Sequence, residues 1–540
     1  MSAETKAAAS ALSTLAAQST PQTATSTTKT QPPPETSESI KTRRYILTSF
    51  WVIIILLGLP IWIYTTTVPR ATLPLDVMNQ WANGQACQFE FPLHVAIESE
   101  RPQDNQQLAR LVQQTLDDHD VSALHHLRIA PGGQLDKRPA VTVKLTGDAA
   151  LKDAKVTTQR YDPVLEIRHA PLSGSPHASG LMPLASIIAG ELRNMFEEEQ
   201  SMLTDLLINA GRQVPNVKRS QDTIDTLSQR SMRTFKYAPT YHLTFSLFSG
   251  DASPAAWEIK AALDEYLQPL LSSFSAISSF TVDTQVQLYA SLSPSMQGPT
   301  LDEKSKQWTL EKSDLSGFIN AAEWPLSPSI GAGPTINFVL YVPSEKQRPL
   351  ILQENGGTSW LIPQWGGVQI LNPTSNQVKR GGLTKDDLQP VMLTFAEQLV
   401  TLLGLPKTPS SLPIQLGTLT RERAASLILS ASSTLGALSR LTLKLTSIAI
   451  PDSVAQSVDK TISHLDQACN DLRNARYASA LEHARTAENE AEQAFFEPSM
   501  VGQVYFPDEH KVAVYVPMLG PMAVPLVMAL LKELKKLRQK

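Results

Sequence analysis

Few residues in this chain suggest chemistry, and its two cysteines come first. Cys469 is preceded by His464, a nucleophile and a base of the kinds that cysteine hydrolases pair. Five residues along a helix turn through about 140°, so the two side chains are expected on different helix faces. Cys469 also continues an apolar helical stripe, where a small buried thiol is ordinary core. Cys87 has no histidine near it in sequence. The state of both cysteines stays open, because an oxidising compartment permits a disulfide that a domain of this size does not need.

Acidic and histidine pairs do not complete a metal site. The run Asp118-His119-Asp120 resembles the acidic pairs that hold metal in glycosyltransferases, but it falls at the expected end of a helix, where polar side chains meet solvent. The remaining paired histidines lack zinc-ligand spacing and cysteine partners; they are His125, His126, His169 and His177.

Paired glycines indicate turns. Neither a phosphate-binding loop nor a Gly-x-Ser-x-Gly motif is present in the sequence. Adjacent glycines allow backbone angles that other residues resist, so Trp365-Gly366-Gly367 is expected to be a structural turn that presents an indole, within its own domain or to another subunit. We assign no catalytic residue, cofactor-binding residue or metal ligand from the sequence.

Two uncharged apolar runs of membrane-spanning length lie near the ends of the chain. Residues 45–64 and residues 512–531 each contain 20 residues without a charge. A helix of about 20 residues reaches the roughly 30 Å of a bilayer's hydrocarbon core. Pro60 predicts a kink in the first run. The sequence therefore predicts a large water-facing domain between two transmembrane helices.

Basic residues flank both runs on the outer side, and they predict the orientation. They are Lys41, Arg43 and Arg44 before the first run, and Lys532, Lys535, Lys536, Arg538 and Lys540 after the second. Positive flanks stay cytosolic. Both termini are therefore expected in the cytosol and the central domain across the membrane, which in a eukaryotic cell is the lumen of the endoplasmic reticulum or a compartment beyond it. The first run lacks a small-residue cleavage pattern, which favours an anchor over a signal peptide.

Composition narrows the class of protein. The chain has 540 residues, a net charge of −4 and 18% charged residues, without a basic stripe suited to nucleic acid. This length exceeds one ordinary domain. The sequence contains no usable Asn-x-Ser/Thr sequon, since Asn372 is followed by proline, so no N-glycan is expected.

Hydrophobic periodicity predicts a mixed α/β luminal domain over residues 70–383. Alternating apolar residues indicate strands and longer 3.6-residue patterns indicate helices. Strands are expected at 89–97, 140–145, 241–248, 280–292, 336–342, 350–353 and 368–371, and helices at 103–118, 184–210 and 255–271. Residues 1–40 are expected to form a disordered cytosolic tail, because their composition cannot bury enough surface to order them. Residues 65–86 are expected to form a linker.

Strand signals nearly stop after Leu383, and residues 384–500 are expected to form a luminal helical region. Three helical stripes, 427–448, 454–472 and 477–495, predict packed helices that lead to the second transmembrane helix at 512–531 and a basic cytosolic tail at 532–540. No internal repeat of fixed period is visible in the sequence.

A proline stripe marks the second membrane helix as an assembly surface. Pro517, Pro521 and Pro525 recur at four-residue intervals, so they share one face of a helix. Each ring leaves a carbonyl without its helical donor, and lipid offers no replacement. Gly520 and Ala523 would let a second helix approach closely. We therefore expect a membrane-helix interface at these five residues.

Several segments resemble the PIG-S family of GPI transamidase subunits, in matching order. They are Arg70-Ala71-Thr72-Leu73-Pro74, residues 241–247 and 281–285, residues 337–343, Pro363-Gln364-Trp365-Gly366-Gly367 with Asn372, residues 494–498 (AFFEP), residues 505–509 (YFPDE), residues 515–517 (YVP) and residues 521–525 (PMAVP). The proline pattern in the last cluster is the most specific of these.

The resemblance implies a non-catalytic scaffold subunit of the GPI transamidase complex of the endoplasmic reticulum membrane, which attaches GPI anchors to proproteins. Its implied partners are the other subunits, including a caspase-like cysteine protease subunit, together with membrane lipid; the proprotein and GPI are candidates for direct contact. Two other classes remain open at this point: a free-standing luminal binding protein or chaperone, and a membrane-anchored glycosyltransferase. Purification without any co-purifying protease subunit would favour the free-standing luminal protein. Activity of the isolated luminal domain that is lost on changing Asp118 and Asp120 would favour the glycosyltransferase.

Overall fold

The structure is a computed structural model of the full chain. It describes residues 36–66, 70–119, 124–133, 138–151, 153–170, 178–212, 221–290, 298–311, 333–445, 448–500 and 509–538. The chain divides into two compact units. The first comprises Met1–Thr67 with Pro507–Lys540, and the second comprises Val68–Phe506. Each unit is described by itself below.

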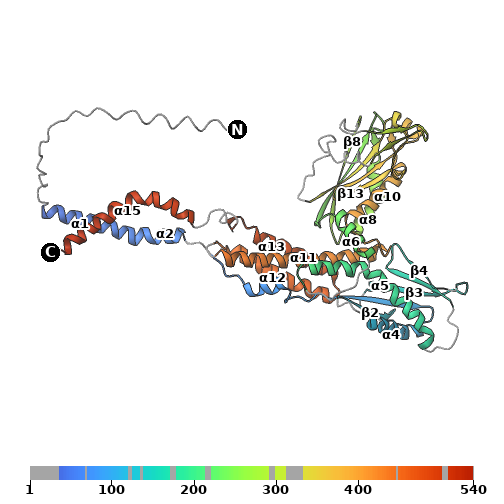
Figure 1. Ribbon diagram of the computed structural model, residues 1–540, viewed down its shortest axis with the longest axis horizontal. Coiled ribbons are helices and arrows are strands. Elements are labelled where there is room, and N and C mark those ends of the chain that lie inside the picture. The colour runs from blue at the N-terminus through green and yellow to red at the C-terminus, as the bar shows by residue number, and fades with distance from the viewer. Residues whose placement is uncertain are drawn as a thin grey trace. The chain divides into compact units, whose positions relative to one another are not determined.

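The first unit contains the two helical segments that the sequence predicted from its apolar runs (Figure 1). Helix α1 (Ser37–Ile53) continues through the π-helical segment η1 (Ile54–Gly58) into α2 (Leu59–Thr66). The π-helical turn ends two residues before Pro60, whose missing backbone N–H leaves one carbonyl without a helical donor. Residues Ser37–Ile61 have the length and mean hydropathy, 1.9, of a membrane span, and none of that stretch is buried.

Helix α15 (Glu509–Arg538) forms the rest of the first unit and contains the whole second apolar run. It stays helical through Pro517, Pro521 and Pro525. Within the described residues, Ser37–Ile61 is the one segment that meets the length and hydropathy criteria for a span. The first span therefore has support from the structure, and the second stays a prediction.

The first lobe of the second unit is a five-stranded sheet with two helices on one face. Its elements are β1 (Phe91–Ser99), α4 (Pro102–His119), β2 (His125–Pro131), β3 (Val141–Gly147), β4 (Lys155–Thr158), β5 (Val164–His169) and α5 (Ala178–Asn209). The strand order is β2-β1-β3-β5-β4, parallel except for β4. Alternate residues of β1, β3 and β5 pack against apolar residues of α4 and α5 in one core.

The second lobe is also a five-stranded sheet, with order β8-β6-β11-β14-β13. Its elements are β6 (Thr240–Ser249), α7 (Ile259–Ala262), η2 (Leu263–Leu267), α8 (Gln268–Ser273), β8 (Ser279–Gln287), β11 (Thr335–Val342), β13 (Ser359–Ile362), β14 (Gly366–Ile370) and α10 (Lys385–Leu402). Phe395 of α10 packs on the sheet, its ring centroid 6.0 Å from that of Phe245 and 5.0 Å from that of Phe338. A smaller sheet of β9 (Thr300–Asp302), β10 (Gln307–Leu310) and β12 (Leu350–Leu352) contributes to a core on the opposite face.

The two lobes share one topology. In each lobe, the chain runs from the first strand (β1 or β6) through helical segments to a parallel strand on one side of it (β2 or β8). The next strand of the sheet (β3 or β11) then pairs on the other side of the first strand. In each lobe, the last parallel strand (β5 or β14) pairs with an antiparallel edge strand (β4 or β13) and precedes a long helix (α5 or α10). Strands β2-β1-β3-β5-β4 thus correspond in order and direction to β8-β6-β11-β14-β13. The repeat lies in the fold, and no residue spacing in the sequence revealed it.

The helical part of the second unit packs as predicted. Helix α11 (Leu412–Lys444), α12 (Asp452–Arg473) and α13 (Tyr477–Phe495) form a bundle, joined by α3 (Leu75–Asn83) on α11. In Figure 1 α11, α12 and α13 run side by side, and the strands of both lobes lie toward one end of these helices. Helix α6 (Gln221–Arg233) connects α5 to the second lobe.

Several local expectations differ from the structure. Residues 65–86 contain α3, whose Met78 and Trp81 are almost completely buried, so this segment is more than a linker. The helix expected from Ala255 begins only at Ile259, because Ala256–Trp257 (β7) pairs with Gly382–Leu383 (β15). Tertiary pairing overrides local helical periodicity at such a segment.

Candidate functional site

Both cysteines of the chain are joined to each other. Cys87, after α3, and Cys469, in α12, form a disulfide, and the chain has no free cysteine. The sequence left the state of both cysteines open, and the expected place of Cys469 in the core is confirmed at 4% exposure. A disulfide-bonded sulfur cannot serve as a thiolate nucleophile. Cysteine-based catalysis by this chain is thereby excluded in the oxidised state.

The histidine considered as a base for Cys469 has a different partner. His464 Nδ1 lies 3.0 Å from Nδ1 of His483, on the neighbouring helix α13. Two nitrogens at this distance share one proton, so at least one of them accepts. Burial, with His483 as a second cause, lowers the pKa of His464 below its ordinary value. The pair fastens α12 to α13.

Two residues of the acidic run at the end of α4, Asp117 and Asp118, are described by the structure. Asp117 accepts a hydrogen bond from Gln113 of its own helix at 2.8 Å, and Asp118 is exposed. Asp120 lies outside the described residues. Within the described ranges, no group of three His, Cys, Asp or Glu side chains is arranged to hold a metal ion.

Gly366 and Gly367 lie at the start of β14, directly after a three-residue connection from β13. Trp365 N–H donates to the Ile362 carbonyl at 3.2 Å, and Asn337 N–H donates to the Trp365 carbonyl at 2.9 Å. A Cβ on Gly366 would lie 1.8 Å from the Asn337 carbonyl oxygen, and one on Gly367 would lie 1.9 Å from Gln398 Oε1. The glycines therefore permit close approach of β14 to β11 and to α10.

Trp365 packs within its own lobe. Its half-buried indole lies against the core that Val339, Val368 and Ile370 form on the outer face of the second sheet. The tryptophan adds apolar area at the end of the β13–β14 hairpin, where the chain reverses. Whether it also meets another subunit stays a prediction.

In the first unit, an acidic residue fastens the two helices. Glu533 of α15 accepts hydrogen bonds from Arg43 at 2.6 Å and Arg44 at 3.1 Å, both on α1, and is only 7% exposed. Glu533 is the one acidic residue in the basic segment 532–540. Its two arginine partners make it the link between the basic ends of α1 and α15.

The proline stripe of α15 has an open face. Pro517, Pro521, Ala523 and Pro525 are exposed. A Cβ built on Gly520 meets no atom within 4 Å in the part of the chain that the structure describes. The structure thus leaves this face free for the neighbouring helix that the prolines favour.

A buried ion pair joins the first lobe to the helical bundle, and sequence reasoning missed it. Arg421 of α11 donates two hydrogen bonds to Glu199 of α5, at 2.5 and 2.7 Å, and Thr418 donates a third at 2.7 Å. His125 Nε2 of β2 lies 3.2 Å from the same carboxylate. Burial alone would raise the pKa of Glu199, but Arg421 and His125 outweigh it and hold the pKa well below its ordinary value.

A second ion cluster lies beside the first. Arg230 of α6 donates to Glu422 at 2.6 Å and to Glu198 at 3.2 Å, and to the Gly404 carbonyl at 2.8 Å. Burial raises the pKa of Glu198 and of Glu422, against the opposing effect of Arg230. Helices α5 and α6, which are consecutive in sequence, therefore meet the distant α11 at paired charges. The signal available in sequence was the pair Glu198-Glu199 inside an otherwise apolar helical stripe.

Comparisons with known proteins agree on one family. The family model described as Phosphatidylinositol-glycan biosynthesis class S protein matches residues 49–540. The chain is 28% identical to the GPI-anchor transamidase component PIGS of Homo sapiens, over 89% of this chain and 93% of that protein. It is 28% identical to the GPI transamidase component PIG-S homolog of Schizosaccharomyces pombe, over 91% of this chain and 84% of that protein. It is 26% identical to the GPI transamidase component GPI17 of Saccharomyces cerevisiae, over 92% and 93%.

Proposed function

This chain belongs to the PIG-S family, and from that premise we propose that it is a non-catalytic scaffold subunit of the GPI transamidase complex in the endoplasmic reticulum membrane. The complex attaches GPI anchors to the carboxyl ends of proproteins. The observation that carries the proposal is the extent of the match, which runs from the first apolar helix through both lobes and the bundle to α15.

A non-catalytic role agrees with the chemistry of the described residues. Transamidation through a thioester needs a free thiolate and a base. Cys87 and Cys469 are bonded to each other, and His464 faces His483. In the proposed assembly a caspase-like cysteine protease subunit performs the cleavage and transfer, and this chain holds other subunits in place.

A luminal position of the second unit is supported by its disulfide. Disulfides form and persist in oxidising compartments such as the lumen of the endoplasmic reticulum. The basic flanks of both helices place the two termini in the cytosol in this proposal. The second unit then works in the lumen between two spans, the first at Ser37–Ile61 and the second along α15.

Contact with other subunits is proposed at the open proline face of α15. The face combines exposed prolines, whose ring positions leave carbonyls without helical donors, with small residues that permit close helix packing. Membrane lipid borders the remaining surface of this helix. Direct contact of this chain with the proprotein or with GPI would add to the scaffold role.

Purification of the full-length chain tests the proposal. The tagged chain is expressed in eukaryotic cells depleted of their own PIG-S homologue, and a GPI-anchored surface reporter is measured beside a reporter with a transmembrane anchor. We expect co-purification of the cysteine protease subunit in mild detergent, and recovery of the GPI-anchored reporter alone. If the chain purifies without any transamidase subunit and the reporter stays lost, the proposal is wrong and a free-standing luminal protein is favoured.

A further inference from the structure

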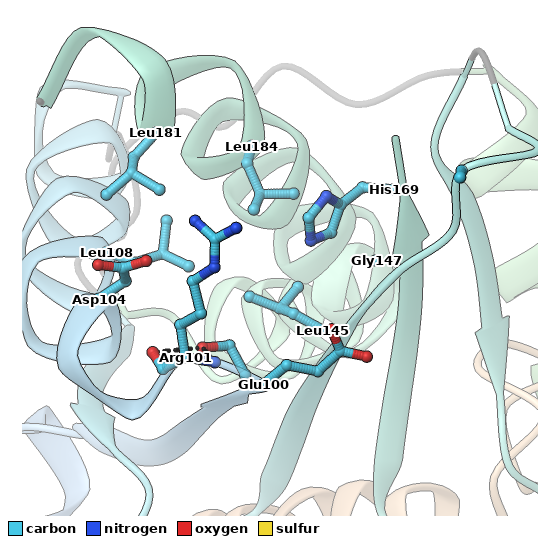
Figure 2. A pocket seen from close by; sticks show the side chains of 11 residues that line it. Glu100, Arg101, Asp104, Leu108, Leu145, Gly147, His169, Leu181 and Leu184 are labelled. Atoms are coloured by element: carbon cyan, nitrogen blue, oxygen red, sulfur yellow. Dashed lines mark hydrogen bonds between the residues drawn. The ribbon is translucent and has the colours of Figure 1, made fainter. Parts of the chain in front are cut away.

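A crevice of about 260 Å³ opens at the carboxyl ends of the parallel strands of the first lobe. Ser99 ends β1, Gly147 ends β3 and His169 ends β5, and all three line the crevice (Figure 2). The carboxyl edge of a parallel sheet is where open α/β folds hold ligands. Helices α4 and α5 contribute the remaining wall.

Two nitrogen-bearing side chains converge in this crevice. Figure 2 shows the Arg101 guanidinium extending into its centre, with the His169 ring on the opposite side. Arg101 has no hydrogen-bond or ion-pair partner for its side chain among the described residues. His169 Nδ1 donates to the Ala170 carbonyl at 2.8 Å, which leaves Nε2 as the ring nitrogen available to a ligand.

The turn that carries Arg101 is fixed by its neighbours. Ser99 Oγ accepts from the Arg101 backbone N–H at 3.2 Å and contacts Asn105 Oδ1 at 2.5 Å. These bonds tie the end of β1 to the first turn of α4. The Arg101 backbone is thereby fixed at the crevice, and the ordering cost of binding falls on its exposed side chain.

Carboxylates border the same crevice at its rim. Asp104 stands on the α4 side, and Glu100 lies near Gly147, where a Cβ would be 3.5 Å from Glu100 Oε2. Neither carboxylate forms an ion pair with Arg101 within the described ranges. The apolar part of the lining is made by four leucines, Leu108, Leu145, Leu181 and Leu184. The crevice therefore presents separated positive and negative groups over an apolar wall.

In the second lobe, the chain itself covers the corresponding edge of the sheet. Asp251, after β6, accepts from the Glu345 backbone N–H at 2.6 Å, and its carboxylate lies 3.9 Å from Arg348. Asn372, after β14, binds both the N–H and the carbonyl of Leu350 at 2.9 Å. The segment between β11 and β12 thus supplies partners for the polar groups at this edge. At the corresponding edge of the first lobe, the charges of Arg101 and Asp104 have no such partner in the described chain.

We propose that the crevice of the first lobe binds a compact zwitterion, whose anionic group contacts Arg101 and whose ammonium contacts Asp104, with Glu100 adding negative potential. The volume lies below the roughly 300–1,000 Å³ of drug-sized sites, so the ligand is a small molecule or a headgroup. An isolated anion would meet two carboxylates, and an isolated cation would meet Arg101. A ligand that carries both charges satisfies both sets. The site is independent of the scaffold role proposed above.

Binding is measured by calorimetry on the full-length chain in detergent, with O-phosphoethanolamine as the probe and with inorganic phosphate and ethanolamine as the two half-ligands. We expect the probe to bind about tenfold or more tightly than either half, because two charge-assisted contacts then act together. Leucine, a carboxylate zwitterion, identifies the anion: tighter binding of leucine assigns a carboxylate, and tighter binding of the probe assigns a phosphate.

Matched variants locate the binding. Arg101→Gln should weaken binding of the zwitterion by about tenfold or more. With Asp104→Asn, the zwitterion should bind no more tightly than the matching anion that lacks the ammonium group. Arg110→Gln, an exposed arginine on the same helix outside the crevice, should leave binding unchanged. No detectable binding of either zwitterion, equal binding of phosphate alone, or binding that survives Arg101→Gln would each overturn the proposal. Equal melting temperatures of the variants exclude loss of fold as the cause.

Discussion

Cys87 and Cys469 are joined across 382 residues of sequence, between the segment after α3 and helix α12. The bond closes almost the whole second unit into one loop, with both lobes inside it. It also determines what these residues do, since the chain has no other cysteine. The first prediction follows from this bond.

Cys469→Ala should lower the thermal stability of the second unit by more than the removal of a small buried side chain. Loss of a native disulfide typically costs about 2–5 kcal/mol, because the unfolded chain regains its freedom. The melting temperature of the full-length protein in detergent provides the measurement. Cys87→Ala and the double variant should match Cys469→Ala, since all three remove one bond. A double variant clearly less stable than either single one would contradict the pairing.

Breaking the buried pair at the lobe–bundle junction should be strongly destabilising. Glu199→Gln leaves Arg421 charged and buried, at a cost of about 3–5 kcal/mol. Glu199→Leu combined with Arg421→Met removes both charges and should recover much of that loss. Glu197→Gln, on the exposed side of the same helix, is the matched control and should have little effect. Equal losses for Glu199→Gln and Glu197→Gln would show that the pair contributes little.

The same pair predicts a pH dependence. The folded-state pKa of Glu199 lies below its unfolded value, so its stabilising effect is present above the unfolded pKa and is lost as pH falls toward the folded one. The difference in melting temperature between the wild type and Glu199→Gln should therefore narrow below about pH 4, near the unfolded pKa of glutamate. A difference that widens in acid would mean that Glu199 is protonated in the folded protein.

Gly366→Ala should destabilise the second lobe, because the new Cβ would lie 1.8 Å from the Asn337 carbonyl and would push β14 away from β11. Overpacking of this kind typically costs about 1–3 kcal/mol. Gly190→Ala is the control: it lies within α5 with nothing within 4 Å of the added Cβ, and alanine there should stabilise by about 0.5–1 kcal/mol. The melting temperatures of both variants provide the measurement. An unchanged melting temperature for Gly366→Ala would refute the close approach of β14 to β11.

Replacing residues 512–531 by polyleucine should keep the chain in the membrane and weaken its hold on other transamidase subunits. A polyleucine helix spans the bilayer but offers neither unpaired carbonyls nor small residues to a neighbour. Co-purification of the protease subunit is compared between the wild type and the swapped chain, with the same exchange at residues 45–64 as control. Unchanged co-purification and unchanged GPI attachment in cells that carry only the swapped chain would show that α15 serves only as a membrane anchor.

Engineered sequons test the orientation of the chain. Gly357→Thr creates an acceptor at Asn355, which lies in an exposed turn after β12, and it should be glycosylated if the second unit is luminal. Gln18→Asn creates one in the amino-terminal tail, and it should stay unmodified. Endoglycosidase-sensitive mobility shifts provide the readout. Modification of the tail variant would reverse the predicted topology.

The sequence by itself determined the local features whose signal lies in neighbouring residues. Apolar alternation predicted β1, β6, β11 and β14, helical stripes predicted α11, α12 and α13, and a charge-free run predicted the first span. The helical signals are periodic because one face of each helix is buried, whereas β6 and β11 are buried on both faces and are marked by nearly continuous apolar runs. The proline and aromatic motifs shared with the PIG-S family also indicated that family, and the comparisons confirmed it.

Only the tertiary structure decided which distant residues meet. The disulfide partner of Cys469, the Glu199–Arg421 pair and the crevice around Arg101 each join segments that no local period relates. The repeated lobe topology was hidden for a related reason, because strand order depends on pairing between segments and not on their spacing. Arg101 and His169 lie in separate stretches of sequence, and they share a crevice because the carboxyl ends of parallel strands meet at one edge of the sheet.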